Sequence, residues 1–194
     1  IVVQRRDPGQ VPAIVQITAN GGAPNRQEAE ADQHGQPFEP TVTALFLPIF
    51  FIPGTIGSVT WLALNEDKLA NIKTGIVVTL VGDSGGFTYK KTRSGDSELD
   101  AAVLQTLKHS TDAYSVRDFI PYGYDERQYS SPGINLQVGC LTRTPFGEFP
   151  EYHTSADNLQ FIKPDKLGEA LIVYHRILHV LAAHPGRQDW TPSE

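Results

Sequence analysis

The fold class is decided by residues 42–81, VTALFLPIFFIPGTIGSVTWLALNEDKLANIKTGIVVTLV. This segment begins with a continuous apolar run from Val42 to Ile52, typical of a strand that is buried on both faces. The turn Gly54 to Ser58 leads into a predicted helix that ends at Ala70, with an apolar side formed by Ile56, Val59, Leu62 and Leu69. The run Ile76 to Val81 predicts a second buried strand. Strand, helix and strand in this order favour a right-handed crossover in a parallel sheet.

The remaining pattern continues the alternation of helices and strands. A helix is predicted from Asp96 to Lys108, begun by Ser94 or Asp96, with Leu99, Val103, Leu104 and Leu107 on one side. Short strands are predicted at Tyr114 to Ile120 and Ile134 to Leu141. A last helix spans Lys166 to Ala183, with an apolar stripe of Leu167, Ala170, Leu171, Tyr174, Leu178 and Leu181. The sequence therefore predicts an α/β domain with a largely parallel or mixed sheet flanked by helices.

Length and charge limit the classes of partner. With 194 residues, 40% of them hydrophobic, the chain can bury one sizeable core. Its formal net charge of -6 and the lack of a basic stripe argue against a nucleic-acid partner. Pro48 and the shortness of the apolar run argue against a membrane span. The single cysteine, Cys140, excludes an intrachain disulfide and favours a cytoplasmic setting, although it is also compatible with export.

The chain divides into three regions by composition. Residues 1–40 are irregular, with four prolines and a long polar run, and only Val11 to Thr18 could form a short strand there. Residues 41–184 carry the regular pattern, and Pro185-Gly186 begins a loose tail over residues 185–194. Because the chain starts at Ile1 and shows no signal-peptide pattern, it is interpreted as a fragment or a processed chain.

Functional side chains concentrate in residues 121–158, a stretch with little helix signal. Here His153 lies in a polar loop, and Asp157 follows four residues later, where a carboxylate can orient a metal-bound histidine. Asp83 ends the second predicted strand, and ligands bind at the carboxyl ends of strands in open α/β sheets. Two alternatives stay open: His153 is solvated or hydrogen-bonded, and Asp83 caps the turn Asp83 to Gly86.

Four motifs, in this order, resemble those of the bacterial aminopeptidase-like domain proteins related to the M28 zinc aminopeptidases. They are Phe51 to Ser58, Val81 to Asp83 with Phe87 to Lys90, Pro121 to Gly133, and Glu151 to Asn158. The resemblance implies a three-layer zinc-exopeptidase-like domain that takes zinc as its cofactor. It also implies a peptide or aminoacyl small-molecule substrate, and a homo-oligomer is left open.

The resemblance also implies site residues. It makes Asp83 and His153 metal ligands, which we expect to converge at one sheet edge, with Asp157 supporting His153. The residues implied to contact substrate are Asp125, Glu126, Arg127, Tyr129 and Tyr152. The alternative for the Asp-Glu-Arg cluster is an exposed loop of ion pairs. No residue is assigned as the general base.

The chain departs from the family pattern at the remaining ligand positions. The histidine-bearing and Asn-Asp-Asn-like motifs of relatives are missing upstream, and His34 lies in a polar run without their context. Gly54-Thr55 stand where relatives have adjacent glutamates. The prediction is therefore an aminopeptidase-like hydrolase domain with an incomplete metal site. The competing prediction is a noncatalytic binding or scaffold module, associated through family context with polysaccharide biosynthesis.

Three other patterns are interpreted as coincidental or structural. Gly82 to Gly86 spells the nucleophile motif of trypsin-like proteases, but His184 follows the motif instead of preceding it, and two β-barrels are not predicted. His175 and His179 have a zinc-chelating spacing on a helix, but they lack the glutamate of HExxH and a third ligand, so solvated helix surface is favoured. Lys90-Lys91 is interpreted as a solvated pair.

Overall fold

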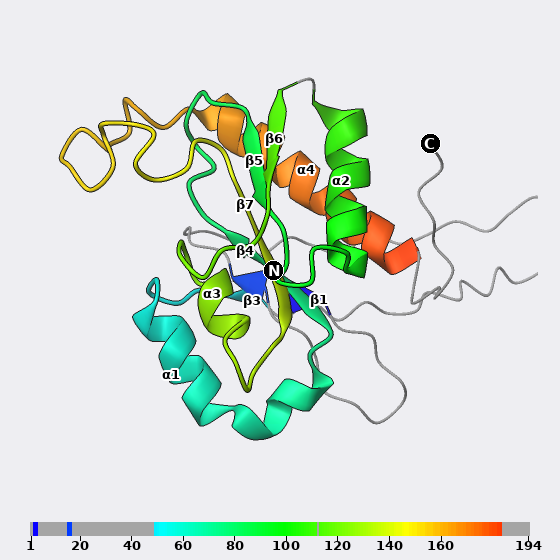
Figure 1. Ribbon diagram of the computed structural model, residues 1–194. Coiled ribbons are helices and arrows are strands. Elements are labelled where there is room, and N and C mark those ends of the chain that lie inside the picture. Colours follow the sequence, from blue (N-terminus) through cyan, green and yellow to red (C-terminus); the bar gives the residue numbers. More distant parts are fainter. Residues whose placement is uncertain (1, 4–14, 17–48, 112, 184–194) are drawn as a thin grey trace, which may run out of the picture.

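The computed structural model describes residues 2–3, 15–16, 49–111 and 113–183 (Figure 1). The strands are β1 (Val2–Val3), β2 (Val15–Gln16), β3 (Ile49–Phe50), β4 (Thr74–Val78), β5 (Phe87–Lys90), β6 (Tyr114–Arg117) and β7 (Gln137–Thr142). The helices are α1 (Ile56–Leu64), the 3-10 helix η1 (Glu66–Asn71), α2 (Glu98–Ser110), α3 (Glu126–Tyr129) and α4 (Pro164–Ala183). The predicted alternation of helices and strands is therefore confirmed from residue 49 onward.

The strands form one mixed sheet in the order β3-β2-β4-β7-β5-β6, with β1 antiparallel to β4. Central strands β4 and β7 are parallel and pair from Thr74 with Gln137 to Val78 with Leu141. β5 runs antiparallel to β7 and parallel to β6. Both β4 and β7 are buried over most of their length, as expected of central strands covered on both faces.

Helices cover both faces of the sheet and complete three layers. One face packs against α2 and α4 through a core that includes Tyr89, Leu99, Leu141 and Ile177. The opposite face packs against α1 and α3 through a core that includes Leu62, Val77, Tyr129, Val138 and Cys140. Neighbouring residues of β4 and β7 thus point into different cores, as the alternation of side chains along a strand requires. The three-layer α/β prediction is confirmed (Figure 1).

The first predicted strand and helix are only partly correct. Of Val42 to Ile52 the structure describes residues 49–52, of which only Ile49–Phe50 form a strand, β3, and Ile49 is 46% exposed. Burial on both faces is wrong for Ile49, since β3 is an outer strand that pairs with β2. The single predicted helix is divided into α1 and η1 at Asn65, whose backbone φ of -134° is not helical.

The predicted apolar side of the first helix is correct only near its end. Leu62 is buried against the sheet, whereas Ile56 and Val59 are 72% and 48% exposed. Ser58 is buried on α1, so this helix packs through a small polar residue that an apolar pattern cannot reveal.

Helix α2 begins at a capping box formed by Ser97 and Asp100. Ser97 is the N-cap, and its hydroxyl accepts a hydrogen bond from the Asp100 backbone N–H at 3.2 Å. The Asp100 carboxylate accepts in return from the Ser97 backbone N–H at 2.8 Å. The predicted start at Ser94 or Asp96 is therefore wrong, because the reciprocal pair selects Ser97.

Helix α4 follows the predicted stripe only in part. Ala170 and Tyr174 are buried, whereas Leu167 and Leu171 are 43% and 68% exposed. None of the helices in the described part of the chain is both long enough and apolar enough to cross a membrane.

Within residues 1–40 the structure describes only the short strands β1 and β2, and β1 was not predicted. β2 lies within the predicted strand segment Val11 to Thr18 and joins β3 to β4. The other predictions for residues 1–40, including His34, and those for residues 185–194 fall outside the described residues.

Candidate functional site

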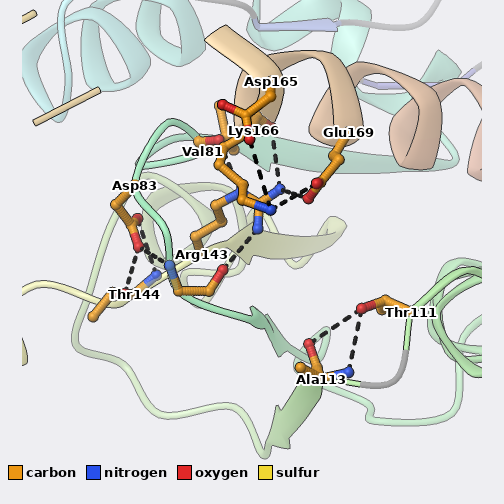
Figure 2. A network of polar contacts seen from close by, with 10 residues as sticks. Val81, Asp83, Thr111, Ala113, Arg143, Thr144, Asp165, Lys166 and Glu169 are labelled. Atoms are coloured by element: carbon orange, nitrogen blue, oxygen red, sulfur yellow. Dashed lines mark hydrogen bonds and ion pairs between the residues drawn. The ribbon is translucent and has the colours of Figure 1, made fainter. Parts of the chain in front are cut away.

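Asp83 lies just beyond β4, at the edge where β4 and β7 end, and its side chain is buried in hydrogen bonds. Its Oδ1 accepts from the Gly85 backbone N–H at 2.7 Å and from the Thr144 hydroxyl at 2.6 Å. Its Oδ2 accepts from the Thr144 backbone N–H at 3.2 Å. The carboxylate therefore caps its own turn and ties it to the end of β7, which is the turn-capping alternative (Figure 2).

Arg143 lies between the Asp83 turn and helix α4, as Figure 2 shows. The residue is only 2% exposed. Its guanidinium donates hydrogen bonds to the carbonyls of Val81, Gly85 and Lys166 at 3.2, 2.7 and 3.1 Å. It also pairs with Glu169 at 2.7 Å. The Lys166 and Arg143 contacts lower the pKa of Glu169. This one side chain joins the Asp83 turn to the first turns of α4.

His153 is exposed and stacks on its neighbour Tyr152, with ring centroids 4.0 Å apart and an interplanar angle of 15°. Its backbone φ is +57°, a left-handed conformation that histidine adopts more readily than most residues. The Tyr152 ring packs near the Phe146 ring, with centroids 6.0 Å apart, and the Phe146 and Tyr124 ring centroids are 5.2 Å apart. A row of aromatic rings thus connects the loop of Tyr124 with the loop of His153.

The His153 loop also returns to the Asp83 turn. Phe149 contacts Tyr152 and stacks on Phe161 at 5.4 Å. Just beyond, the Lys163 backbone N–H donates to the Gly82 carbonyl at 2.8 Å. Asp83 and Asp157 border the same pocket of about 540 Å³, whose wall is mostly apolar. The two candidate regions are therefore neighbours in the fold.

The described residues do not fit a complete zinc site. Among residues 49–111 and 113–183, no three His, Cys, Asp or Glu side chains are grouped so that they could hold an ion. A zinc ion in a protein takes about three or four protein ligands. The metal roles of Asp83 and His153, and the supporting role of the exposed Asp157, stay predictions.

Asp125 anchors the loop that begins α1. It is 4% exposed, and its Oδ1 accepts from the Thr55 backbone N–H at 2.5 Å. Thr55 has a φ of +61°, an uncommon conformation for a β-branched residue. The carboxylate also places negative charge beside the N-terminus of α1, where the helix dipole favours it. Asp125 thus holds the segment Gly54-Thr55 in place.

Glu126 is fully buried and forms an ion pair with Lys90, whose Nζ lies 2.5 Å from Oε1. The other carboxylate oxygen, Oε2, is buried without a hydrogen-bond partner. Gly123 has a φ of +142°, and a Cβ there would lie 2.7 Å from Oε1 and 2.8 Å from Nζ. The pair therefore depends on glycine at this position. An exposed ion-pair loop is wrong for Asp125 and Glu126, and the solvated-pair interpretation is wrong for Lys90.

Cys140 borders a small cavity of about 120 Å³ together with Lys90 and Glu126. Burial raises the pKa of the Cys140 thiol well above its usual value, and the nearby Glu126 carboxylate adds to the increase. The thiol is therefore protonated at neutral pH, and a protonated, buried thiol is a poor nucleophile.

Tyr129 and Arg127 complete the candidate substrate loop. Tyr129 is 2% exposed and packs in the core beside α1 and α3, and burial raises its pKa to about 12. Arg127 is half-buried, and its Nε is buried without a hydrogen-bond partner. Of the five residues predicted to contact substrate, Arg127 and Tyr152 are thus the two with side chains that are not buried. Substrate contact stays a prediction for all five.

Tyr129→Phe should make the protein less sensitive to alkali. Below pH 10 the phenol is protonated in both the unfolded and folded states, so its ionisation does not alter stability. As the pH rises from 10 through the folded pKa of about 12, ionisation favours the unfolded state. We expect the phenylalanine variant to avoid about 2–3 kcal/mol of this loss. Urea unfolding between pH 9 and pH 12 measures it, with the exposed Tyr114→Phe as control; equal pH dependence in both variants would refute the prediction.

Lys90, Arg143 and Thr144 organise the site but were not proposed from the sequence. Each acts on a partner far along the chain, as Lys90 does on Glu126 and Arg143 on the Val81 carbonyl. Lys90 and the carboxylates of the 121–129 loop carry opposite charges, but no local pattern brings them together, because β5 was not predicted as a strand.

Comparison with known proteins agrees with this architecture. Residues 43–184 match the family described as "Domain of unknown function (DUF4910)". The chain belongs to this family. It is 52% identical over 131 residues to a Clostridium acetobutylicum protein named "Putative polysaccharide biosynthesis protein with aminopeptidase-like domain". That match covers 68% of this chain but 30% of the relative, so the chain spans less than a third of that protein.

Solved structures show the same fold. A crystal structure described as a "putative peptidase" from Clostridium acetobutylicum is 50% identical, with a TM-score of 0.68, over 70% of this chain and 32% of that one. BSAP, a zinc aminopeptidase from Bacillus subtilis, is 17% identical, with a TM-score of 0.57, over 69% of this chain and 35% of its own. The DUF4910 chain is therefore an aminopeptidase-like domain, and its α/β fold excludes the two-barrel protease suggested by Gly82 to Gly86.

Proposed function

We propose that this DUF4910 domain belongs to an aminopeptidase-type hydrolase that acts on the amino-terminal end of a peptide or on an aminoacyl small molecule. The observation that carries the proposal is the aromatic row from Tyr124 to Tyr152, beside His153. It connects the candidate substrate loop with the candidate metal loop, which returns to the Asp83 turn through Lys163 and Gly82.

The residues have separable roles in this proposal. Tyr152 holds the His153 ring by stacking, and Asp125 holds the Thr55 backbone at the start of α1. In the complete hydrolase, zinc would supply an activated water, with Asp83 and His153 as an oxygen and an imidazole ligand of the kinds that zinc accepts. Because the described residues do not fit a full ligand set, no catalytic step is assigned to them.

The 194-residue chain should show little aminopeptidase activity on its own. Two ligands hold zinc weakly, and without a general base the water has no designated proton acceptor. We expect less than one zinc per chain by elemental analysis. We also expect no release of aniline from aminoacyl-anilides beyond the rate without protein.

Robust activity that a chelator abolishes would contradict this expectation, and would mean that residues outside the described part supply ligands. In that case His153→Asn should abolish the activity, whereas His109→Asn, a change of the same kind on the exposed face of α2, should not.

A second candidate function is a noncatalytic binding or scaffold module. It is favoured by the Asp83 carboxylate, which already accepts three hydrogen bonds within the fold. The printed name of the Clostridium relative suggests polysaccharide biosynthesis as the setting. Calorimetry with short peptides and aminoacyl amides distinguishes the two functions, because a binding module should bind without turnover even when zinc is supplied.

A further inference from the structure

Helix α4 carries a pair of histidines outside the candidate site. His175 and His179 are both exposed and lie one helical turn apart. Their rings are 4.4 Å apart at 64°, and the two Nε2 atoms face each other at 3.2 Å. The two ring nitrogens are therefore close enough to share a hydrogen bond or a bound cation.

This separation fits two nitrogens that bind the same metal ion. Bonds of about 2.0–2.1 Å from one ion to both nitrogens would span 3.2 Å at an angle of about 100°. That angle lies between the right angle of square or octahedral geometry and the tetrahedral angle of about 109°. The helix therefore presents two imidazoles already spaced for chelation.

We propose that His175 and His179 form a bidentate site for a late first-row divalent metal ion. Imidazole suits Cu²⁺, Zn²⁺ and Ni²⁺, and Cu²⁺ should bind most tightly by the usual order of affinities. Mg²⁺ and Ca²⁺ should not bind, because they prefer oxygen ligands.

The surroundings leave the site accessible to a cation. Arg176, the charged residue between them in sequence, donates from Nη1 to the Ser110 hydroxyl at 2.9 Å and is thus held toward α2. No third ligand groups with the pair in the described part of the chain. An ion would therefore keep positions for water or for an incoming ligand. His175 also borders the 540 Å³ pocket, so such a ligand could extend over its apolar wall.

Without metal, one imidazole can donate a hydrogen bond from Nε2 to Nε2 of the other at 3.2 Å. The donor ring then carries its hydrogen on Nε2 and the acceptor ring carries its hydrogen on Nδ1. Coordination needs an unprotonated Nε2 on both rings. Metal binding should therefore move one ring to the tautomer with hydrogen on Nδ1, a change that nitrogen NMR of the histidine rings detects.

The test is calorimetric titration of the whole chain with Zn²⁺, Cu²⁺ and Mg²⁺. His175→Asn and His179→Asn should each weaken Zn²⁺ binding at least about tenfold, because the second bond of a chelate is intramolecular. His109→Asn is the matched control, since that histidine is also exposed on a helix without another histidine one turn away, and its affinity should stay within about twofold of the parent.

His153→Asn should also leave this affinity unchanged, which separates the α4 pair from the candidate zinc ligand of the proposed function. Unchanged thermal midpoints exclude misfolding of the variants. No Zn²⁺ binding by the parent at about 1 mM ion would overturn the proposal, because even a weak chelate should bind there. Equal affinity of parent, His175→Asn and His179→Asn would overturn it too, as would ring signals that do not shift together on NMR titration.

Discussion

Arg143→Met should lower the free energy of unfolding by about 3–5 kcal/mol, because it removes a buried guanidinium that donates to three backbone carbonyls. Methionine keeps an apolar stem where the guanidinium lies over the Phe87 ring, 4.4 Å from its centroid. It cannot donate to the carbonyls of Val81, Gly85 and Lys166, which would lose their partner together. An unsatisfied buried acceptor costs about 1–3 kcal/mol.

Arg117→Met is the matched control for this change. Arg117 pairs with Glu148 at 2.7 Å, but both side chains are about half exposed, at 46% and 47%. Exposed pairs contribute about 0–1 kcal/mol, so the control should unfold at nearly the parental urea concentration. If urea titrations showed the same small loss of unfolding free energy for both variants, the hydrogen bonds of Arg143 would not stabilise this sheet edge.

The sequence predicted those elements whose patterns are local. α2, α4, β4 and β7 carry apolar runs or stripes long enough to identify without knowledge of their partners. β5 was missed because its four residues, FTYK, follow a glycine-rich turn and become a strand by pairing with β7 and β6. β3 was overestimated because its apolar residues suggested burial that an outer strand does not have. Pairing between distant segments is what local patterns omit.

The candidate site shows the same division. Asp83 was expected at the end of a strand that reached Val81, but β4 ends at Val78, and Asp83 lies in the turn beyond it. Its actual partner, Thr144, lies 61 residues away and reaches it only through the alignment of β4 with β7. In the 121–129 loop, Asp125 and Glu126 were taken for surface or substrate-binding charges. Both are buried, because the Thr55 backbone and Lys90 supply partners that no local pattern contains.

Asp100 is the second position where a single change should be severe. The residue is only 1% exposed. Its carboxylate accepts hydrogen bonds from the Tyr89 hydroxyl at 2.8 Å and the Thr92 backbone N–H at 2.9 Å. It also accepts from the Thr92 hydroxyl at 2.5 Å, and from the Ser97 hydroxyl and backbone N–H at 2.7 and 2.8 Å. One carboxylate thereby joins the end of β5 to the start of α2.

Asp100→Ala should cost about 3–4 kcal/mol of unfolding free energy, because it removes half of the capping box and leaves buried donors on Tyr89 and Thr92 unsatisfied. Glu98→Ala is the control, since Glu98 lies in the same first turn but is exposed. There only the favourable contact with the helix dipole is lost, about 0.3–1 kcal/mol. Urea unfolding of both variants gives the comparison.

A double-mutant cycle shows how the loss at Asp100 is distributed. Tyr89→Phe removes the hydroxyl while the ring keeps its place in the core. If the Tyr89 hydroxyl and Asp100 stabilise each other, the double variant should lose less than the sum of the single losses by at least about 0.5 kcal/mol. Strict additivity would show that the Tyr89 hydroxyl takes no part in the loss. Asp100 would then act through the α2 cap and through its hydrogen bonds from Thr92, which follows β5.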